Sequence, residues 1–169
     1  VDALMTTTRK NLPYWKETVD LYVGLGIRNI HLRPLNPFGF AAKTAKMIGY
    51  SMEEYMDFYQ KAFAYIIELN KQGVQIMEGT AATFLKKMLT SRDPNFVDIR
   101  SPIGSGTGQI SYNYDGKVYP SDEGRMVAAM GDEYFLLGKV NELSYEDMVN
   151  HPTVKTMAVA SYVDSLPSC

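Results

Sequence analysis

Polar residues that could bind a ligand stand where predicted β-strands end. Thr7 belongs to the threonine run that closes a strand-like segment, residues 3–8; Arg33 closes "RNIHLR", and Glu78 follows "VQIM". Strands that alternate with helices run parallel, so their carboxyl ends meet at one edge, where barrel enzymes build their sites. A threonine hydroxyl there could bond a ribose or a peptide, and the arginine could pair with a carboxylate.

Each of these residues also has a purely structural interpretation. Threonine is β-branched and favours strands in any case. Arg33 could lie on the surface and satisfy loop carbonyls, and Glu78 could be a charge at a helix N-terminus. The loop after Arg33 adds two candidates for a substrate entrance, Asn36 and Gly39.

The elements that would position these residues alternate regularly. A helix begins near Pro13 and can end at Gly26, and a second begins at Ser51, which forms a capping-box pattern with Glu54, and stops near Gly73. A third helix, residues 80–89, follows a strand at 74–77. Strand, helix, strand, helix, strand, helix is typical of a parallel α/β fold with right-handed crossovers.

From Arg92 onward the pattern changes. "GQISYNYDGKVYPSDEGRM" predicts a β-hairpin with a two-residue turn at Asp115-Gly116, and short helices are expected after Ser144 and after His151-Pro152. "GSGTG" before the hairpin lacks a Lys-Ser/Thr sequel and precedes a strand, which favours a plain turn over a phosphate loop. We place a boundary near Asp98, giving regions 1–97 and 98–169.

Composition narrows the class of protein. Of 169 residues, 46% are apolar and 21% charged, and the net charge is −2. The sequence shows no basic block for nucleic acid or anionic membranes and no apolar run of membrane-spanning length. Two isolated histidines argue against a zinc site, and a single cysteine, Cys169, is typical of a reducing compartment, so we expect a cytoplasmic protein. The abrupt ends indicate a piece cut from a longer chain.

Three segments in this order, "ALMTTTR", "LGIRNIHLRPLNPFGFA" and "GQISYNYDGKVYPSDEGRM", resemble radical SAM maturases with a C-terminal SPASM or twitch-type module. The resemblance is greatest to maturases of His-Xaa-Ser-type peptide systems and covers nearly the whole chain. It implies that residues 1–97 are the C-terminal part of a partial (β/α)6 barrel and residues 98–169 a truncated SPASM/twitch-like module. The CxxxCxxC motif that holds the [4Fe-4S] cluster and S-adenosylmethionine in such enzymes is absent from this sequence.

The resemblance also assigns roles to residues. It implies S-adenosylmethionine contacts for Thr7 and Arg33, and a ligand of an auxiliary cluster in the parent protein for Cys169. The substrate contacts that it implies are Asn36, Gly39 and Glu78.

Two positions depart from the family pattern. Ser121 and Ile103 stand where such modules often carry cysteines, and neither replaces a thiolate on iron. Either this branch naturally lacks a cluster at the hairpin, or cysteines were replaced. We therefore expect this chain to hold no complete iron–sulfur cluster.

The expected function is that of a C-terminal fragment, inactive alone, of an enzyme that modifies a peptide or protein by 5'-deoxyadenosyl-radical hydrogen abstraction. The alternative is a non-catalytic module that binds a peptide or protein. An α/β hydrolase or isomerase fragment has little support, because the sequence shows neither a GxSxG motif nor a Ser-His-Asp set. Half a barrel would leave the first strand with an unpaired edge, so we also expect the isolated chain to self-associate or to cover that edge with its own tail.

Overall fold

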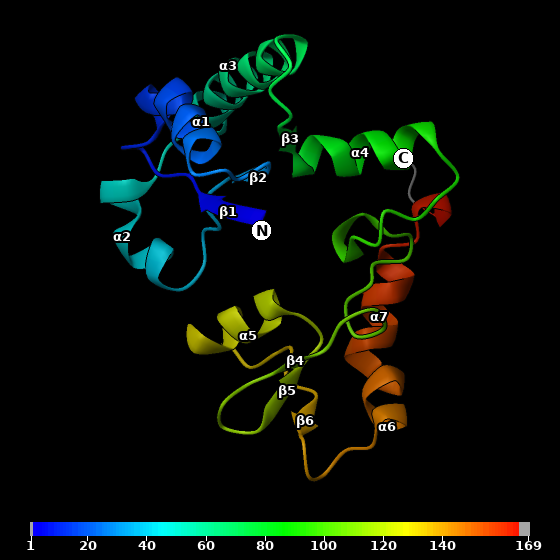
Figure 1. Cartoon of the computed structure of the whole chain (residues 1–169). Helices are drawn as coiled ribbons and strands as arrows, with labels where there is room; N and C mark the ends of the chain where they lie inside the picture. The colour runs from blue at the N-terminus through cyan, green and yellow to red at the C-terminus, as the bar shows by residue number, and fades with distance from the viewer. Residues whose placement is uncertain (1, 166–169) are drawn as a thin grey trace. The chain divides into compact units, whose positions relative to one another are not determined.

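The computed structural model describes residues 2–165; residue 1 and residues 166–169 lie outside the described part. The chain forms two compact units, residues 1–94 and residues 95–169 (Figure 1). Among the described residues, no helix is long and apolar enough to cross a membrane. Assignment of residues 98–169 to a SPASM/twitch-like module stays a prediction.

The first unit is built on a parallel sheet. Its strands are β1 (Asp2–Thr6), β2 (Asn29–Arg33) and β3 (Met77–Glu78), in the order β1-β2-β3. Met5 lies opposite Leu32 in the register of β1 and β2. The predicted parallel α/β alternation is therefore confirmed, but the sheet is open, and residues 2–165 contain no closed barrel. A partial (β/α)6 barrel stays a prediction.

Helices follow each strand of this sheet. They are η1 (Leu12–Tyr14), α1 (Trp15–Gly24), α2 (Phe40–Ile48), α3 (Met52–Lys71) and α4 (Gly79–Leu89). The predicted capping box is present, because Ser51 Oγ accepts from the Glu54 N–H at 3.2 Å and Glu54 Oε2 accepts from the Ser51 N–H at 2.7 Å. Helix α2 was not predicted: it has no side-chain cap at Gly39, although its Ala-, Lys- and Met-rich sequence favours helix.

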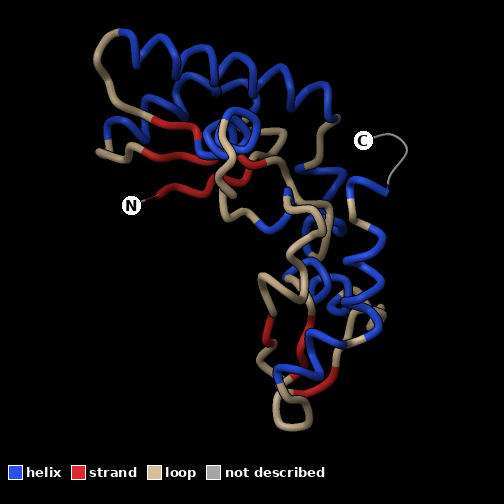
Figure 2. Tube along the Cα trace, turned by 90° about the vertical axis from the view of Figure 1, so that its right-hand side faces the viewer, coloured by secondary structure: helices blue, strands red, loops and turns tan. Residues whose placement is uncertain are grey.

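The core of the first unit lies between the sheet and two helices, α1 and α3. Ile30 and Leu32 of β2 are fully buried and pack with Val19 of α1 and Phe58 of α3. Figure 2 shows these helices over one face of the strands. Residues of β2 that alternate with Ile30 and Leu32, such as the exposed Arg33, face the other side of the sheet.

The two edges of the sheet differ. Beyond β3, the Asn70 side chain occupies the position of a missing strand, because Asn70 Nδ2 donates to the Ile76 carbonyl at 2.7 Å and Asn70 Oδ1 accepts from the Ile76 N–H at 3.4 Å. At the other edge, β1 pairs with β2 alone among the described strands. Self-association through the β1 edge stays a prediction.

The second unit contains a small antiparallel sheet formed by β4 (Ser111–Tyr112), β5 (Lys117–Tyr119) and β6 (Gly138–Lys139). Its helices are η2 (Val97–Ile99), α5 (Asp122–Ala129), α6 (Tyr145–Asn150), α7 (Pro152–Ala160) and η3 (Val163–Ser165). Val118 of β5 packs with Met148 of α6 and Val154 of α7 in a separate core. The expected helices after Ser144 and His151-Pro152 are confirmed, whereas β6 was not predicted.

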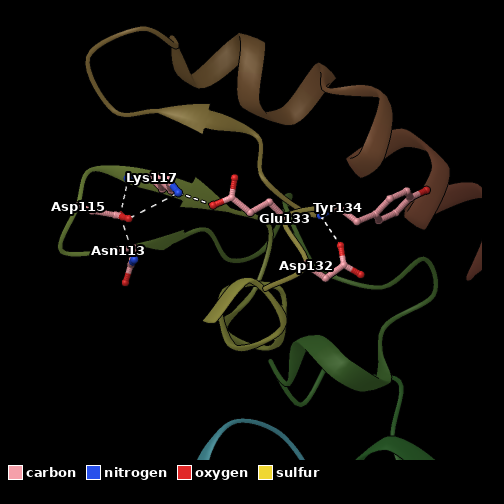
Figure 3. A network of polar contacts seen from close by, with 6 residues as sticks. All are labelled: Asn113, Asp115, Lys117, Asp132, Glu133 and Tyr134. Atoms are coloured by element: carbon pink, nitrogen blue, oxygen red, sulfur yellow. Dashed lines mark hydrogen bonds and ion pairs between the residues drawn. The ribbon is translucent and has the colours of Figure 1, made fainter. Parts of the chain in front are cut away.

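The turn of the hairpin differs from the predicted one. The Asn113 N–H donates to the Lys117 carbonyl at 2.8 Å, and the Gly116 N–H donates to the Asn113 carbonyl at 3.0 Å. The loop thus has three residues, and Gly116 (φ 80°) adopts the left-handed conformation whereas Asp115 does not. A turn followed by a left-handed glycine is the common three-residue hairpin solution. Figure 3 shows Asp115 bound to its neighbours in this loop.

Candidate functional site

Three strand ends meet beside Leu32 and Arg33. The Thr7 N–H donates to the Arg33 carbonyl at 3.1 Å, and Glu78 Oε1 accepts from the Leu32 N–H at 3.1 Å. The structure therefore brings Thr7, Arg33 and Glu78 to the carboxyl edge of one sheet. In open α/β sheets this edge is where ligands commonly bind.

Two candidate residues carry buried polar atoms that lack a partner. Thr7 is fully buried, and neither its Oγ1 nor Oδ1 of Asn36 has a hydrogen-bond partner within residues 2–165. Buried polar atoms are nearly always hydrogen-bonded, so an orphaned hydroxyl and an orphaned amide oxygen at this edge need an explanation. A bound polar ligand would provide one.

Glu78 is fully engaged within the fold. It is 3% exposed, and its Oε2 accepts from Ala81 N–H at 2.6 Å and from the Tyr59 hydroxyl at 2.7 Å. Since β3 ends before reaching Leu32, the Glu78 carboxylate continues the hydrogen bonding of β2 in place of a strand. The helix-cap interpretation of Glu78 is thus confirmed, and a substrate contact by this residue stays a prediction.

Tyrosines of α3 and the preceding loop complete this network. The Tyr55 hydroxyl donates to the Leu32 carbonyl at 2.5 Å, and the Tyr50 hydroxyl accepts from the Leu35 N–H at 2.5 Å. The spacing of the aromatic residues on α3 predicts a buried stripe, which is correct for the rings but misses their hydroxyls. The helical spacing of Tyr55 and Tyr59 is the only sequence signal for their shared direction.

Burial raises the pKa of both Tyr55 and Tyr59 far above the usual value of 10.0, and the nearby Glu78 carboxylate adds to the effect. A group whose pKa is raised by folding contributes its full stabilising effect below the pKa that it has in the unfolded state, and this effect is lost as the pH rises toward its pKa in the folded state. We therefore expect stability to be insensitive to these tyrosines below pH 10 and to fall as pH rises above about 10, where the unfolded tyrosines ionise first.

Urea unfolding curves between pH 8 and pH 11 test this expectation. The double variant Tyr55→Phe/Tyr59→Phe should be less stable at pH 8, because it loses two hydrogen bonds, but its stability should decline less above pH 10. An equal decline in both proteins would contradict the assignment. Tyr114→Phe, at the 99% exposed hairpin tip, is the control.

The remaining candidates of this edge are more open. The Arg33 side chain is exposed. Gly39 immediately precedes α2 with φ 61°, a left-handed conformation that suits glycine. Their predicted ligand contacts stay predictions.

In the second unit, Ser121 has a structural role. Its side chain is 5% exposed, and Oγ accepts from the Gly124 N–H at 3.2 Å at the start of α5. The backbone N–H of Ile103 donates to Ser161 Oγ of α7 at 2.9 Å. Ser121 is thus the N-cap of α5.

The glycine-rich segment before the hairpin directs its N–H groups inward. The Gly106 N–H donates to the Pro120 carbonyl at 2.8 Å, and the N–H groups of Thr107, Gly108 and Gln109 donate to the Gly104 carbonyl at 2.6–3.2 Å. A phosphate loop needs such groups free to point at an anion. The interpretation as a turn is therefore supported.

A polar network joins the hairpin to the segment after α5. Lys117 Nζ binds the Glu133 carboxylate and lies 3.9 Å from Asp115 Oδ2, while Asp132 Oδ1 accepts from the Tyr134 N–H at 2.9 Å (Figure 3). The hydrogen bond from the Lys117 N–H lowers the pKa of Asp115. These exposed pairs fix local geometry and contribute little to stability.

Metal-binding residues do not gather within residues 2–165, where no group of three or more His, Cys, Asp or Glu side chains could hold an ion. His31 packs against Gly79, and His151 Nδ1 accepts from the Thr153 N–H at 3.2 Å as the cap of α7. Cys169, the predicted ligand of an auxiliary cluster, lies outside the described residues.

Two solved structures resemble this chain. Hexahistidine-tagged anSMEcpe with bound AdoMet superposes with a TM-score of 0.69 at 16% identity, covering 94% of this chain and 39% of that one. Native anSMEcpe with bound AdoMet gives a TM-score of 0.70 at 16% identity, covering 94% and 41%. The chain thus spans about two fifths of the length of these structures. No family model matches the sequence, and no curated protein does. The likeness shows that this chain shares the fold of the matching part of anSMEcpe.

Proposed function

We propose that this chain is the C-terminal part of a radical SAM enzyme that modifies a peptide or protein substrate and that it is inactive alone. The observation that carries the proposal is the likeness over 94% of the chain to anSMEcpe, solved with bound AdoMet. Reductive cleavage of AdoMet by a [4Fe-4S] cluster supplies the radical that abstracts hydrogen in such enzymes. We propose the cytoplasm as its location.

The polar atoms at the carboxyl edge of the first sheet support a contact with part of an AdoMet molecule. The orphaned Thr7 hydroxyl can donate to an oxygen of the ligand, and the orphaned Asn36 Oδ1 can accept from a ribose hydroxyl or an ammonium group. Arg33, exposed at the same edge, can pair with a carboxylate. Glu78 contributes by holding Leu32, and therefore the end of β2, in place.

The same proposal assigns the second unit to a SPASM/twitch-like module that has no iron–sulfur cluster at the hairpin. Ser121 is integrated into the α5 cap, a role that a cysteine would fill less well, which favours natural loss over replacement.

The decisive experiment starts with the reading frame of the parent gene. We expect a CxxxCxxC motif upstream and further cysteines downstream of Cys169. The complete protein, reconstituted anaerobically with iron, sulfide, AdoMet and dithionite, should then release 5'-deoxyadenosine, measured by mass spectrometry. A frame without CxxxCxxC would overturn the proposal and leave a non-catalytic peptide-binding module.

Thr7→Val separates binding from stability. Because Thr7 Oγ1 has no described partner, replacing the hydroxyl by an isosteric methyl should leave the stability of the complete protein unchanged or raise it by up to about 1 kcal/mol. AdoMet affinity, measured by equilibrium dialysis, should fall about five- to tenfold.

The neighbouring Thr8 provides the matched control. Thr8 Oγ1 donates to Asn11 Oδ1 at 2.5 Å, so Thr8→Val should lower stability by about 1 kcal/mol and leave AdoMet affinity nearly unchanged. Unchanged affinity in Thr7→Val would contradict the proposed contact.

A further inference from the structure

An open apolar groove runs along the first unit between α3 and α4. From α3 it is lined by Phe63, Ile66 and Ile67, and from α4 by Ala81, Ala82 and Leu85. These residues recur at spacings of three and four, so each helix presents one continuous stripe to the groove.

The stripe on α4 continues beyond the groove without cover. Phe84, Leu85, Met88 and Leu89 are 49%, 50%, 75% and 75% exposed. Helices in proteins are stabilised mainly by burying their apolar face, and this part of α4 leaves its apolar face in water. Exposed apolar patches of this kind usually mark interaction sites. Figure 1 shows α3 running into β3 and α4 running away from it.

The edge of the sheet beside this groove does not favour an added strand. A strand added here would run beside β3 and the residue before it, Ile76, whose N–H and carbonyl the Asn70 amide already bonds. Neither backbone group is free to add a strand. Two helices with apolar stripes facing a common groove instead offer ridges and grooves to a third helix.

The charged residues around the groove indicate which charge a bound helix would carry beside its apolar face. Lys71 lines the groove, and Lys86 borders it one helical turn after Ala82. Lys71 lies 3.5 Å from Glu68 in an exposed pair, which only weakly offsets its charge. The acidic residue in the lining, Glu78, is buried and already bonded. The unit as a whole has twelve Lys and Arg against nine Asp and Glu, a net charge of +3.

We propose that the groove between α3 and α4 binds an amphipathic helix of a protein partner, apolar on one face and flanked by acidic residues. The apolar face supplies the affinity, and the acidic flanks meet Lys71 and Lys86. This inference does not depend on AdoMet binding or on radical chemistry.

The test uses the full chain and a fluorescein-labelled synthetic peptide of about 18 residues, five helical turns, with leucines at helical spacing and glutamates beside them. A second peptide carries lysines in place of the glutamates, and a third has the same composition in an order that is not amphipathic. Binding is measured by fluorescence anisotropy at low and high salt. We expect the glutamate peptide to bind at least about tenfold tighter than either control, with affinity falling as salt rises.

Variants locate the site. Leu85→Glu places a negative charge, the same sign as the glutamates of the peptide, in the groove and should weaken binding of that peptide about tenfold or more. Lys71→Gln/Lys86→Gln should mainly remove the salt dependence of binding. Leu21→Glu is the matched control: Leu21 lies on α1, outside the groove, and is 60% exposed, against 50% for Leu85. Circular dichroism verifies that all variants are folded.

Equal binding of the glutamate and lysine peptides would overturn the acidic partner, and binding that Leu85→Glu leaves unchanged would overturn the groove. Self-association abolished by Leu85→Glu, without peptide binding, would assign the groove to a second copy of the chain and also overturn the proposal.

Discussion

Glu78→Ala should lower the free energy of unfolding by about 3–4 kcal/mol, measured by urea denaturation. The substitution removes the acceptor of three hydrogen bonds, from Leu32 N–H, the Tyr59 hydroxyl and Ala81 N–H. A buried donor left without a partner costs about 1–3 kcal/mol, and the lost cap of α4 adds about 1 kcal/mol. Water can reach the Ala81 N–H at the start of α4 in the variant, so the total loss should stay below the sum of the largest individual costs.

Two controls isolate the cause of this loss. Glu78→Gln preserves the shape and one acceptor oxygen, so its cost should be about 1–2 kcal/mol. Glu68→Ala removes an exposed carboxylate whose partners are Lys71 and Gln72, and it should cost less than about 0.5 kcal/mol. A cost below about 1 kcal/mol for Glu78→Ala would show that the network does not hold the end of β2.

Gly106→Ala is the second substitution with a large expected effect, a loss of about 2–4 kcal/mol. Gly106 has φ 81°, and an added Cβ would lie 2.5 Å from Cγ2 of Val154, which is 1% exposed on α7. The left-handed conformation costs a non-glycine residue about 1–2 kcal/mol, and overpacking a core costs about 1–3 kcal/mol. A glycine at position 106 therefore allows the backbone of this turn to pack directly against Val154 in the core of the second unit.

Other glycines separate the two contributions. Gly131 has φ 101° and open space around a Cβ, so Gly131→Ala should cost about 1–2 kcal/mol, from conformation alone. Gly24 has open space and an ordinary φ at the end of α1, so Gly24→Ala should be neutral or stabilise by up to about 1 kcal/mol. Equal losses at Gly106 and Gly131 would exclude the contact with Val154.

Features whose hydrogen bonds close within a few residues could be predicted from the amino-acid sequence. The capping box of Ser51 with Glu54 forms as its spacing predicts, and helices begin after Ser144 and His151-Pro152 as expected. Alternating strand and helix patterns predicted the parallel sheet, because periodicity reports which face of an element is apolar.

The pairing of polar groups that are far apart in the chain could not be predicted, because it depends on how whole elements pack. Glu78 reaches Leu32 across 46 residues, and Asn70 closes the edge of β3. The same holds for the Thr7 hydroxyl, which has no hydrogen-bond partner among the residues that the structure describes. A short strand leaves donors and acceptors that some side chain must satisfy, and which side chain arrives depends on the packing of whole helices. The spacing of apolar residues does not show which side chain satisfies which backbone group. The candidate residues could therefore be named from the sequence, but which of their polar atoms are hydrogen-bonded could not be predicted.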